Sequence, residues 1–116
     1  MENAGDKRKY KRFKKEVEIH FEMITAMGDS PAIPDSGDSR SINVSMGGVL
    51  FETKKPIPVS SIIECQFHIA GFKEPIYAKA KIVRVEELYT NKYDLGIQFI
   101  AISDDDRKVL EKYITA

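Results

Sequence analysis

Apolar and polar residues alternate in several short segments of this 116-residue chain, and this pattern limits the possible fold more than any other feature. The first such segment is Glu16–Ala26, whose apolar positions are Val17, Ile19, Phe21 and Met23. A repeat of two residues is typical of a β-strand with one buried face, because successive side chains of a strand point to opposite sides. We therefore expect Glu16–Ala26 to form a half-buried strand.

Five further segments have the composition of strands. They are Ser41–Ser45, Gly48–Thr53, Val59–Ala70, Ile76–Glu87 and Tyr93–Ile100. A tight turn at Met46–Gly48 predicts that the first two of these form a hairpin, and the last two, separated by polar residues, predict a longer one. In the Ile76–Glu87 strand the apolar face switches at Ile82 and Val83, which indicates a β-bulge or a strongly curved strand.

Two other segments differ from this pattern. Gly28–Arg40 is rich in Gly, Pro, Ser and Asp, which predicts a long loop. At the other end Ser103 precedes three aspartates, and apolar residues then recur at helical spacing, which predicts a capped helix. Six short strands and one helix are best accommodated by an all-β fold, a six-stranded antiparallel barrel closed by a C-terminal α-helix.

The bulk composition fits a single globular domain. A chain of this length buries a core without disulfides or a metal, and a single cysteine does not form an intramolecular disulfide. The chain lacks the apolar stretch of a signal peptide and the roughly 18 apolar residues of a membrane helix. We therefore expect a cytoplasmic protein without membrane insertion.

The formal net charge of zero conceals a strongly basic segment. Lys7–Lys15 contains 7 of the 18 basic residues and no acidic ones, which leaves 11 basic against 18 acidic side chains elsewhere. Such an arrangement attracts an anion at one place rather than along the whole surface. We divide the chain into a flexible basic ligand-binding segment, residues 1–15, and a barrel domain with its helix, residues 16–116.

Arg8 and Arg12 are the only arginines in the basic segment, and their spacing places them on the same side of an extended chain. The planar arginine fork bonds two phosphate oxygens at once or bridges O6 and N7 of guanine, which a lysine ammonium does not do. A pair of arginines therefore suits a guanine nucleotide. The segment taken alone is also compatible with a solvated basic tail or a nonspecific polyanion-binding arm.

A second polar cluster follows at Asn43–Gly48. Asn43 and Ser45 are two residues apart on an expected strand, so both should point away from the core that Ile42 and Val44 face. Gly47 and Gly48 then offer positive φ and an unobstructed approach to backbone amides. Taken alone, this cluster is also compatible with an ordinary hairpin turn with polar caps.

Together the two clusters resemble the signature of the PilZ domain family. Arg8–Arg12 matches R-x-x-x-R, and Asn43–Gly48 matches D/N-x-S-x-x-G, with Asn at the position that is often Asp. The order of basic start, strand, second motif, hairpin, two longer strands ending in LGIQF and final helix is similar to this family over nearly the whole chain. The loop before the second motif is rather long for it.

The resemblance implies a PilZ-type barrel and a receptor for the bacterial second messenger cyclic di-GMP, usually bound as an intercalated pair. It implies that Arg8 and Arg12 wrap over the ligand while Asn43, Ser45 and Gly48 hold a guanine and a phosphate. We add Lys9 and Gly47, which lie within the two motifs, to the predicted ligand-binding set. The expected partners are the nucleotide and a downstream protein, and no cofactor beyond the ligand is expected.

Two other functions stay open. Tyr10 and Phe13 interleave with basic residues, as in small barrels that bind single-stranded nucleic acid, although the acidic remainder of the chain opposes this. The other is an interaction module of PilZ fold that does not bind the nucleotide. We expect neither a metal site nor an enzyme, and we interpret His20 with Glu18 and Glu22 as ordinary surface.

Nucleophilic catalysis has no support in the sequence either. Cys65 and His68 alternate along one predicted strand, so they face opposite sides of it and do not form a nucleophile and base pair. The sequence shows no Ser, His and Asp constellation, no phosphate-cradling glycine loop and no paired-carboxylate signature. Cys65 is best interpreted as a buried thiol.

Overall fold

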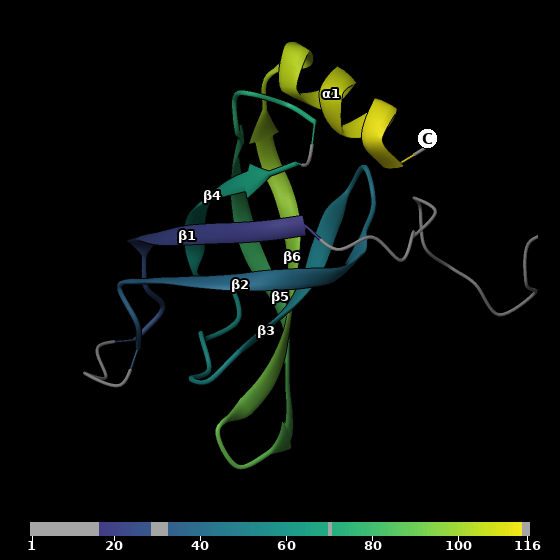
Figure 1. Cartoon of the computed structure of the whole chain (residues 1–116). Helices are drawn as coiled ribbons and strands as arrows, with labels where there is room; N and C mark the ends of the chain where they lie inside the picture. Colours follow the sequence, from purple (N-terminus) through teal and green to yellow (C-terminus); the bar gives the residue numbers. More distant parts are fainter. Residues whose placement is uncertain (1–16, 29–32, 70, 115–116) are drawn as a thin grey trace, which may run out of the picture.

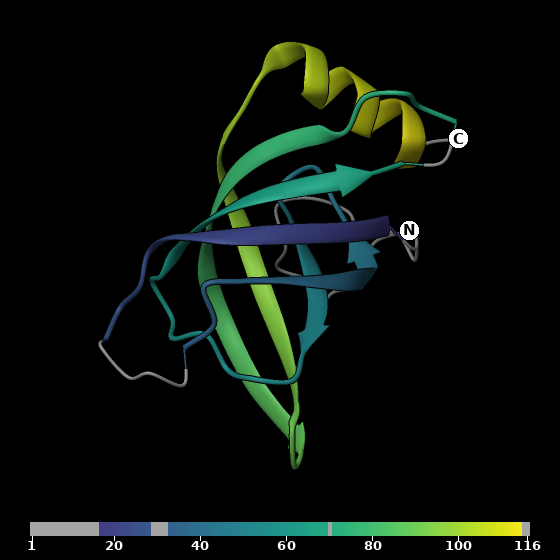
Figure 2. The same cartoon turned by 60° about the vertical axis from the view of Figure 1, so that its left-hand side comes forward.

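A computed structural model describes residues 17–28, 33–69 and 71–114, with the backbone alone at positions 41 and 42. Six antiparallel strands form a closed barrel in the order β1-β2-β3-β6-β5-β4 (Figures 1 and 2). The strands are β1 Val17–Thr25, β2 Ser36–Val44, β3 Gly48–Thr53, β4 Ile62–His68, β5 Ile76–Tyr89 and β6 Lys92–Ile102. The predicted six-stranded barrel is thus confirmed.

Closure depends on β1, which pairs with β2 on one side and with β4 on the other. The alternation of the sequence determines which side chains enter the barrel. The predicted inward positions of β1 and β4 are buried, except Met23, which is half-buried. The ring of Phe21 lies 5.9 Å from that of Phe51. A second aromatic pair, Phe67 and Phe99, lies at 5.7 Å. The core is therefore continuous across the barrel.

The helix α1, Asp104–Ile114, covers one end of the barrel (Figure 1). Its predicted cap is confirmed, because the backbone N–H of Asp106 donates to the Ser103 hydroxyl at 3.1 Å. Leu110 and Ile114 bury their side chains in the core. The described residues contain no helix that is long and apolar enough to cross a membrane.

The prediction of a loop over Gly28–Arg40 is wrong for its second half, because β2 begins at Ser36. The small polar residues of this half have little strand preference of their own, and their pairing with β1 decides their conformation. Gly37 lies opposite Phe21, and a Cβ atom at Gly37 would stand 2.8 Å from the Phe21 ring. The glycine that indicated a loop is instead required by core packing.

The hairpin of β5 and β6 is longer than predicted. Only Thr90 and Asn91 connect the two strands, and Asn91 adopts the left-handed conformation with φ of 62°. The bulge predicted at Ile82 and Val83 is confirmed by a register shift between Ile82 and Arg84. Val83 is 44% exposed, so the bulge turns this side chain out of the core. The tip of the hairpin projects from the end of the barrel opposite α1 (Figure 1).

We predict that Gly37→Ala destabilises the protein, although alanine usually stabilises a strand position relative to glycine. The added methyl group would push the Phe21 ring out of its place in the core, at a cost of about 1–3 kcal/mol. Urea denaturation measures this difference, with Ser36→Ala on the exposed adjacent position as control. Equal or greater stability of Gly37→Ala would show that the core adapts to the methyl group.

Candidate functional site

The turn between β2 and β3 is held together by Ser45, which is only 8% exposed. Its hydroxyl accepts hydrogen bonds from the backbone N–H groups of Gly47 and Gly48 and donates to the carbonyl of Gly48, each at 3.2 Å. The backbone N–H of Ser45 also donates to the Gly48 carbonyl, at 2.9 Å. Ser45 therefore shapes the turn, and its predicted contact with a ligand stays a prediction.

Gly48 is the first residue of β3 and lies opposite Gln98 of β6. A Cβ atom at Gly48 would stand 1.9 Å from the carbonyl oxygen of Ile97, so only glycine allows β3 and β6 to approach here. The turn does not use the positive φ available to Gly47 and Gly48, since Gly28 and Gly71 are the described glycines with positive φ. Close backbone packing, rather than left-handed conformation, is what requires glycine at position 48.

Asn43 occupies the outer side of β2. It is paired with Leu50, whereas the next pair, Val44 and Val49, is buried inside the barrel. The prediction that Asn43 and Ser45 share an exposed face is only half right, because β2 ends at Val44 and Ser45 folds into the turn. No hydrogen bond within the described part of the chain engages the Asn43 side chain, which is half-buried. The predicted burial of Ile42 lies outside the described side chains.

The outer surface beside this turn is formed by rows of paired residues across β3, β6 and β5, here called the outer platform. The first row is Gly48, Gln98 and Lys81, and the second is Leu50, Gly96 and Arg84. Leu50 is half-buried and Gly96 has no side chain, so the second row forms a low, partly apolar floor. Gln98 rises from the first row as an exposed amide.

The third row of the platform is acidic and consists of Glu52, Asp94 and Glu86. Burial and then the charges of Glu52 and Glu86 raise the pKa of Asp94 above its ordinary value. Among the described residues, the Oδ1 atom of Asp94 is buried without a hydrogen-bond partner. Two cations compensate part of the negative charge of this row. Lys92 lies 3.4 Å from Glu52, and Arg84 lies 2.5 Å from Glu86. An anion is therefore disfavoured at this end of the platform.

The predicted ligand-binding residues Arg8, Lys9 and Arg12 lie outside the described residues. The structure does show where their segment joins the barrel, because Val17 pairs with Ser41, two residues before Asn43. Arg12 precedes Val17 by five residues, and an extended chain of five residues spans at most about 17 Å. The start of the barrel is thus adjacent to the strand that leads into the second motif. In the sequence, Arg12 and Asn43 are 31 positions apart.

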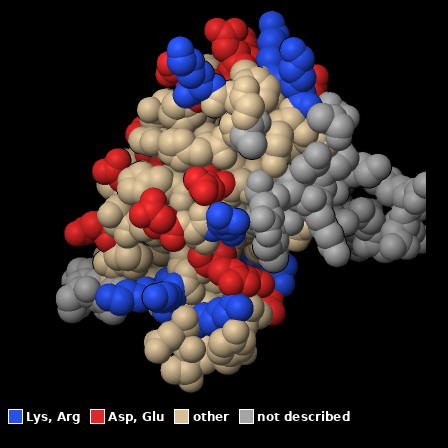
Figure 3. Space-filling model, viewed as in Figure 1, with Lys and Arg blue, Asp and Glu red and all other residues tan. Residues whose placement is uncertain are grey.

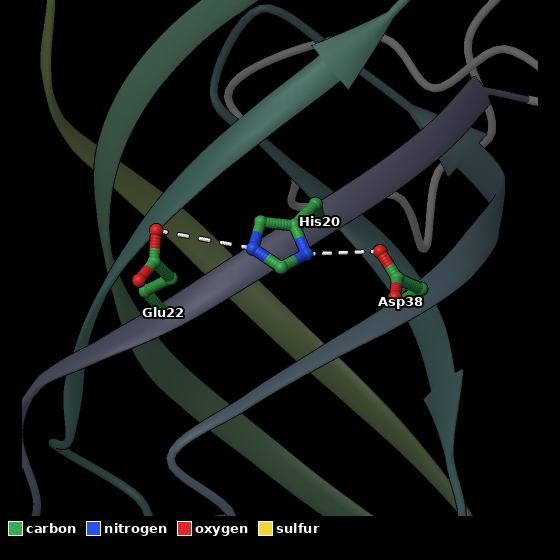
Figure 4. A network of polar contacts seen from close by, with 3 residues as sticks. All are labelled: His20, Glu22 and Asp38. Carbon is green, nitrogen blue, oxygen red and sulfur yellow. Dashed lines mark hydrogen bonds and ion pairs between the residues drawn. The ribbon is translucent and has the colours of Figure 1, made fainter.

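His20 belongs to a separate network on the outer side of β1 (Figure 4). Its Nδ1 atom lies 2.9 Å from Asp38 and its Nε2 atom 3.8 Å from Glu22. Glu18, on the same side of β1, does not join this network and lies 3.6 Å from the guanidinium of Arg40. Within residues 17–28, 33–69 and 71–114, no group of His, Cys, Asp and Glu has the geometry of a metal site.

The charge on this side of the molecule is mixed (Figure 3). Acidic side chains outnumber basic ones across the middle of the face that carries β1 and β2. A groove that follows a nucleic-acid backbone needs a continuous positive surface, which this face does not offer. This face gives no support to the nucleic-acid alternative.

Cys65 is fully buried, as predicted, and His68 on the same strand is exposed on the opposite face. Burial, followed by the charge of Glu64, raises the pKa of the Cys65 thiol to about 12. A thiolate is the reactive form of cysteine, so this residue is not an activated nucleophile.

Comparison with known proteins agrees with both the fold and the motifs. The family model described as PilZ domain matches residues 6–116. Solved structures with the same fold include Bacillus subtilis MotI/DgrA, an inhibitor of motility, at a TM-score of 0.74 and 14% identity, covering 95% of this chain and 50% of that one. The chain thus spans half of MotI/DgrA.

Two further structures contain cyclic di-GMP. The PilZ domain of YcgR from Escherichia coli has a TM-score of 0.69 and 16% identity, covering 95% of this chain and 90% of that one. MrkH from K. pneumonia has a TM-score of 0.66 and 18% identity, covering 92% of this chain and 50% of that one. No curated protein matches the sequence.

We predict that Asp94→Asn stabilises the protein at neutral pH. The raised pKa means that the folded state holds this proton more tightly than the unfolded state, so stability falls as pH rises through the window between the two pKa values. Asparagine removes the repelling charge and offers N–H donors to the flanking carboxylates. Thermal unfolding between pH 4 and 8 should show a higher Tm that converges with wild type at low pH.

The exposed loop residue Glu74 provides the control for Asp94, as Glu74→Gln removes a carboxylate charge away from the platform. An equal gain in Tm in both variants would show that the change in net charge, rather than the loss of repulsion within the acidic row, causes the stabilisation.

Proposed function

Because the chain belongs to the PilZ domain family, we propose that it is a receptor for cyclic di-GMP, which binds between the Arg8–Arg12 motif and the Asn43–Gly48 turn. The observation that carries this proposal is the pairing of Val17 with Ser41, which brings the start of the barrel beside the second motif. Neither motif identified a ligand by itself. We propose that the two together form one site with a cationic side and a hydrogen-bonding side.

The chemistry of the two sides is complementary to a guanine dinucleotide. Arg8 and Arg12 supply planar donors for phosphate oxygens and for guanine O6 and N7, and Lys9 adds a third positive charge. The Asn43 amide, which donates and accepts, faces the outside of the barrel at the same place. We propose that the ligand is an intercalated pair, for which the outer platform provides the supporting surface.

The proposed activity is binding, without a cofactor and without catalysis. The arginines precede the first strand, so ligand binding that orders residues 1–15 changes the surface offered to another protein. The similar structures have different outputs: MotI/DgrA is an inhibitor of motility and MrkH a transcription regulatory factor. We infer that this domain acts on a downstream protein in the cytoplasm, with its pathway set by that partner.

We predict that Arg12→Ala weakens cyclic di-GMP binding by at least about tenfold, since a lost charge-assisted contact in a partly desolvated site costs on the order of 2 to 5 kcal/mol. Isothermal titration calorimetry with the purified full chain measures this. Lys14→Ala removes the same charge from the same segment outside the motif and should change affinity much less. Equal affinities for wild type and Arg12→Ala would remove Arg12 from the site.

Hydrogen–deuterium exchange provides a second test, because it reports the backbone of residues 1–15 directly. Saturation with cyclic di-GMP should slow exchange in this segment and in peptides covering Asn43–Gly48, while β4 and α1 stay unchanged. The Arg12→Ala variant at the same nucleotide concentration is the control. Protection restricted to Asn43–Gly48, with none in residues 1–15, would contradict the proposed closure over the ligand.

A further inference from the structure

The register of the barrel points to an extension of the nucleotide site beyond its two motifs. We propose that the site continues from the Asn43–Gly48 turn across β6 to β5, where Gln98 hydrogen-bonds the nucleotide and Lys81 contacts its phosphate. This inference rests on the proposed function. It adds two contact residues to the site. They follow the second motif by up to 50 positions in the sequence, but the strand register places them in one row with Gly48.

The first row of the platform places the two residues at useful distances from the turn. Gln98 is the direct partner of Gly48 on one side and of Lys81 on the other. Neighbouring strands lie about 4.8 Å apart, so the Cα atom of Lys81 lies about 10 Å from that of Gly48. A ligand held at the turn therefore meets Gln98 first and Lys81 next. Both side chains point outward, since the adjacent Ile97 and Ile82 are buried.

The surroundings of Lys81 leave its charge available. Its row partners are Gln98 and, on β4, Ile62, neither of which is acidic. Within the described residues Lys81 takes part in no ion pair. Arg84 in the second row differs, because it is bound to Glu86. Lys81 is thus the cation of the platform that is open to an added anion.

The acidic third row makes the charge distribution of the platform asymmetric. Glu52, Asp94 and Glu86 oppose negative charge two rows away from Gln98 and Lys81. The electrostatic energy of a nucleotide on the platform is lowest when its phosphates lie near Lys81 and away from these carboxylates. Between the two ends, Leu50 and Gly96 form the low floor on which a base can lie flat. The charge pattern and the floor together orient the ligand.

The chemistry of the two side chains fits these positions. The Gln98 amide both donates and accepts, which matches the mixed edge of guanine or a ribose hydroxyl. The Lys81 ammonium is a point charge that binds phosphate without demanding one geometry. A single nucleotide at the turn would leave Lys81 at the margin of the site. A pair of nucleotides extends far enough to use it.

The role of Lys81 is tested by comparing the cyclic di-GMP affinities of Lys81→Ala and Lys79→Ala. Lys79 lies two residues earlier on the same outer side of β5, so its removal changes net charge equally, but its row partner on β4 is Glu64. We expect Lys81→Ala to raise the Kd for cyclic di-GMP about tenfold and Lys79→Ala to change it less than about twofold, consistent with one charge-assisted contact. Tm values equal to wild type exclude a folding defect as the cause.

Gln98 is tested by two substitutions of different charge. Gln98→Ala should weaken binding about threefold, and Gln98→Glu more strongly, because its carboxylate faces the same anion as Lys81. If wild type does not bind cyclic di-GMP, the proposed function and this inference both fail. If wild type binds and Arg12→Ala weakens binding, but Lys81→Ala equals Lys79→Ala, the function stands and this inference alone is overturned.

Discussion

The double pairing of β1, with β2 on one side and β4 on the other, is the constraint on which the rest of the structure depends. It closes the barrel, and it also determines where the basic segment joins the domain. The pairing that buries Phe21 against Gly37 continues to Val17 and Ser41, so the packing of the core and the position of the site are set by one strand register. A slip of this register by one residue would turn the apolar face of β1 outward and shift Val17 relative to Ser41.

The second motif shows that residues of a binding signature can act first on the fold. The Ser45 hydroxyl is engaged by the backbone of its own turn, and Gly48 is required because the Ile97 carbonyl leaves no space for a side chain. Substitution at either position therefore perturbs the shape of the turn before any contact with a ligand is lost. Asn43 differs, since its side chain lies on the outer side of β2 and takes no part in the hydrogen bonds that shape the turn.

The sequence predicted the fold well because alternation is a local signal: it identified six strands, the capped helix and the bulge after Ile82. It failed at Ser36–Arg40, where residues with little strand preference are held by pairing with β1, a contact distant in sequence. The same limit applies to the site. The two motifs were recognisable as motifs, whereas Lys81 resembles any surface lysine until the register places it in one row with Gly48.

The electrostatic pattern of the outer platform connects these observations. A domain that only displayed a basic segment would attract any polyanion, including nucleic acid. Here residues 7–15 supply a concentrated positive charge, and the outer platform combines Lys81, which takes part in no ion pair among the described residues, with three carboxylates two rows away. A long anion that crossed the platform would have to pass Asp94, whose pKa is raised by burial and then by the charges of Glu52 and Glu86. The three carboxylates therefore oppose an anion that extends along the whole platform, and this charge pattern favours a compact anion near Gln98 and Lys81.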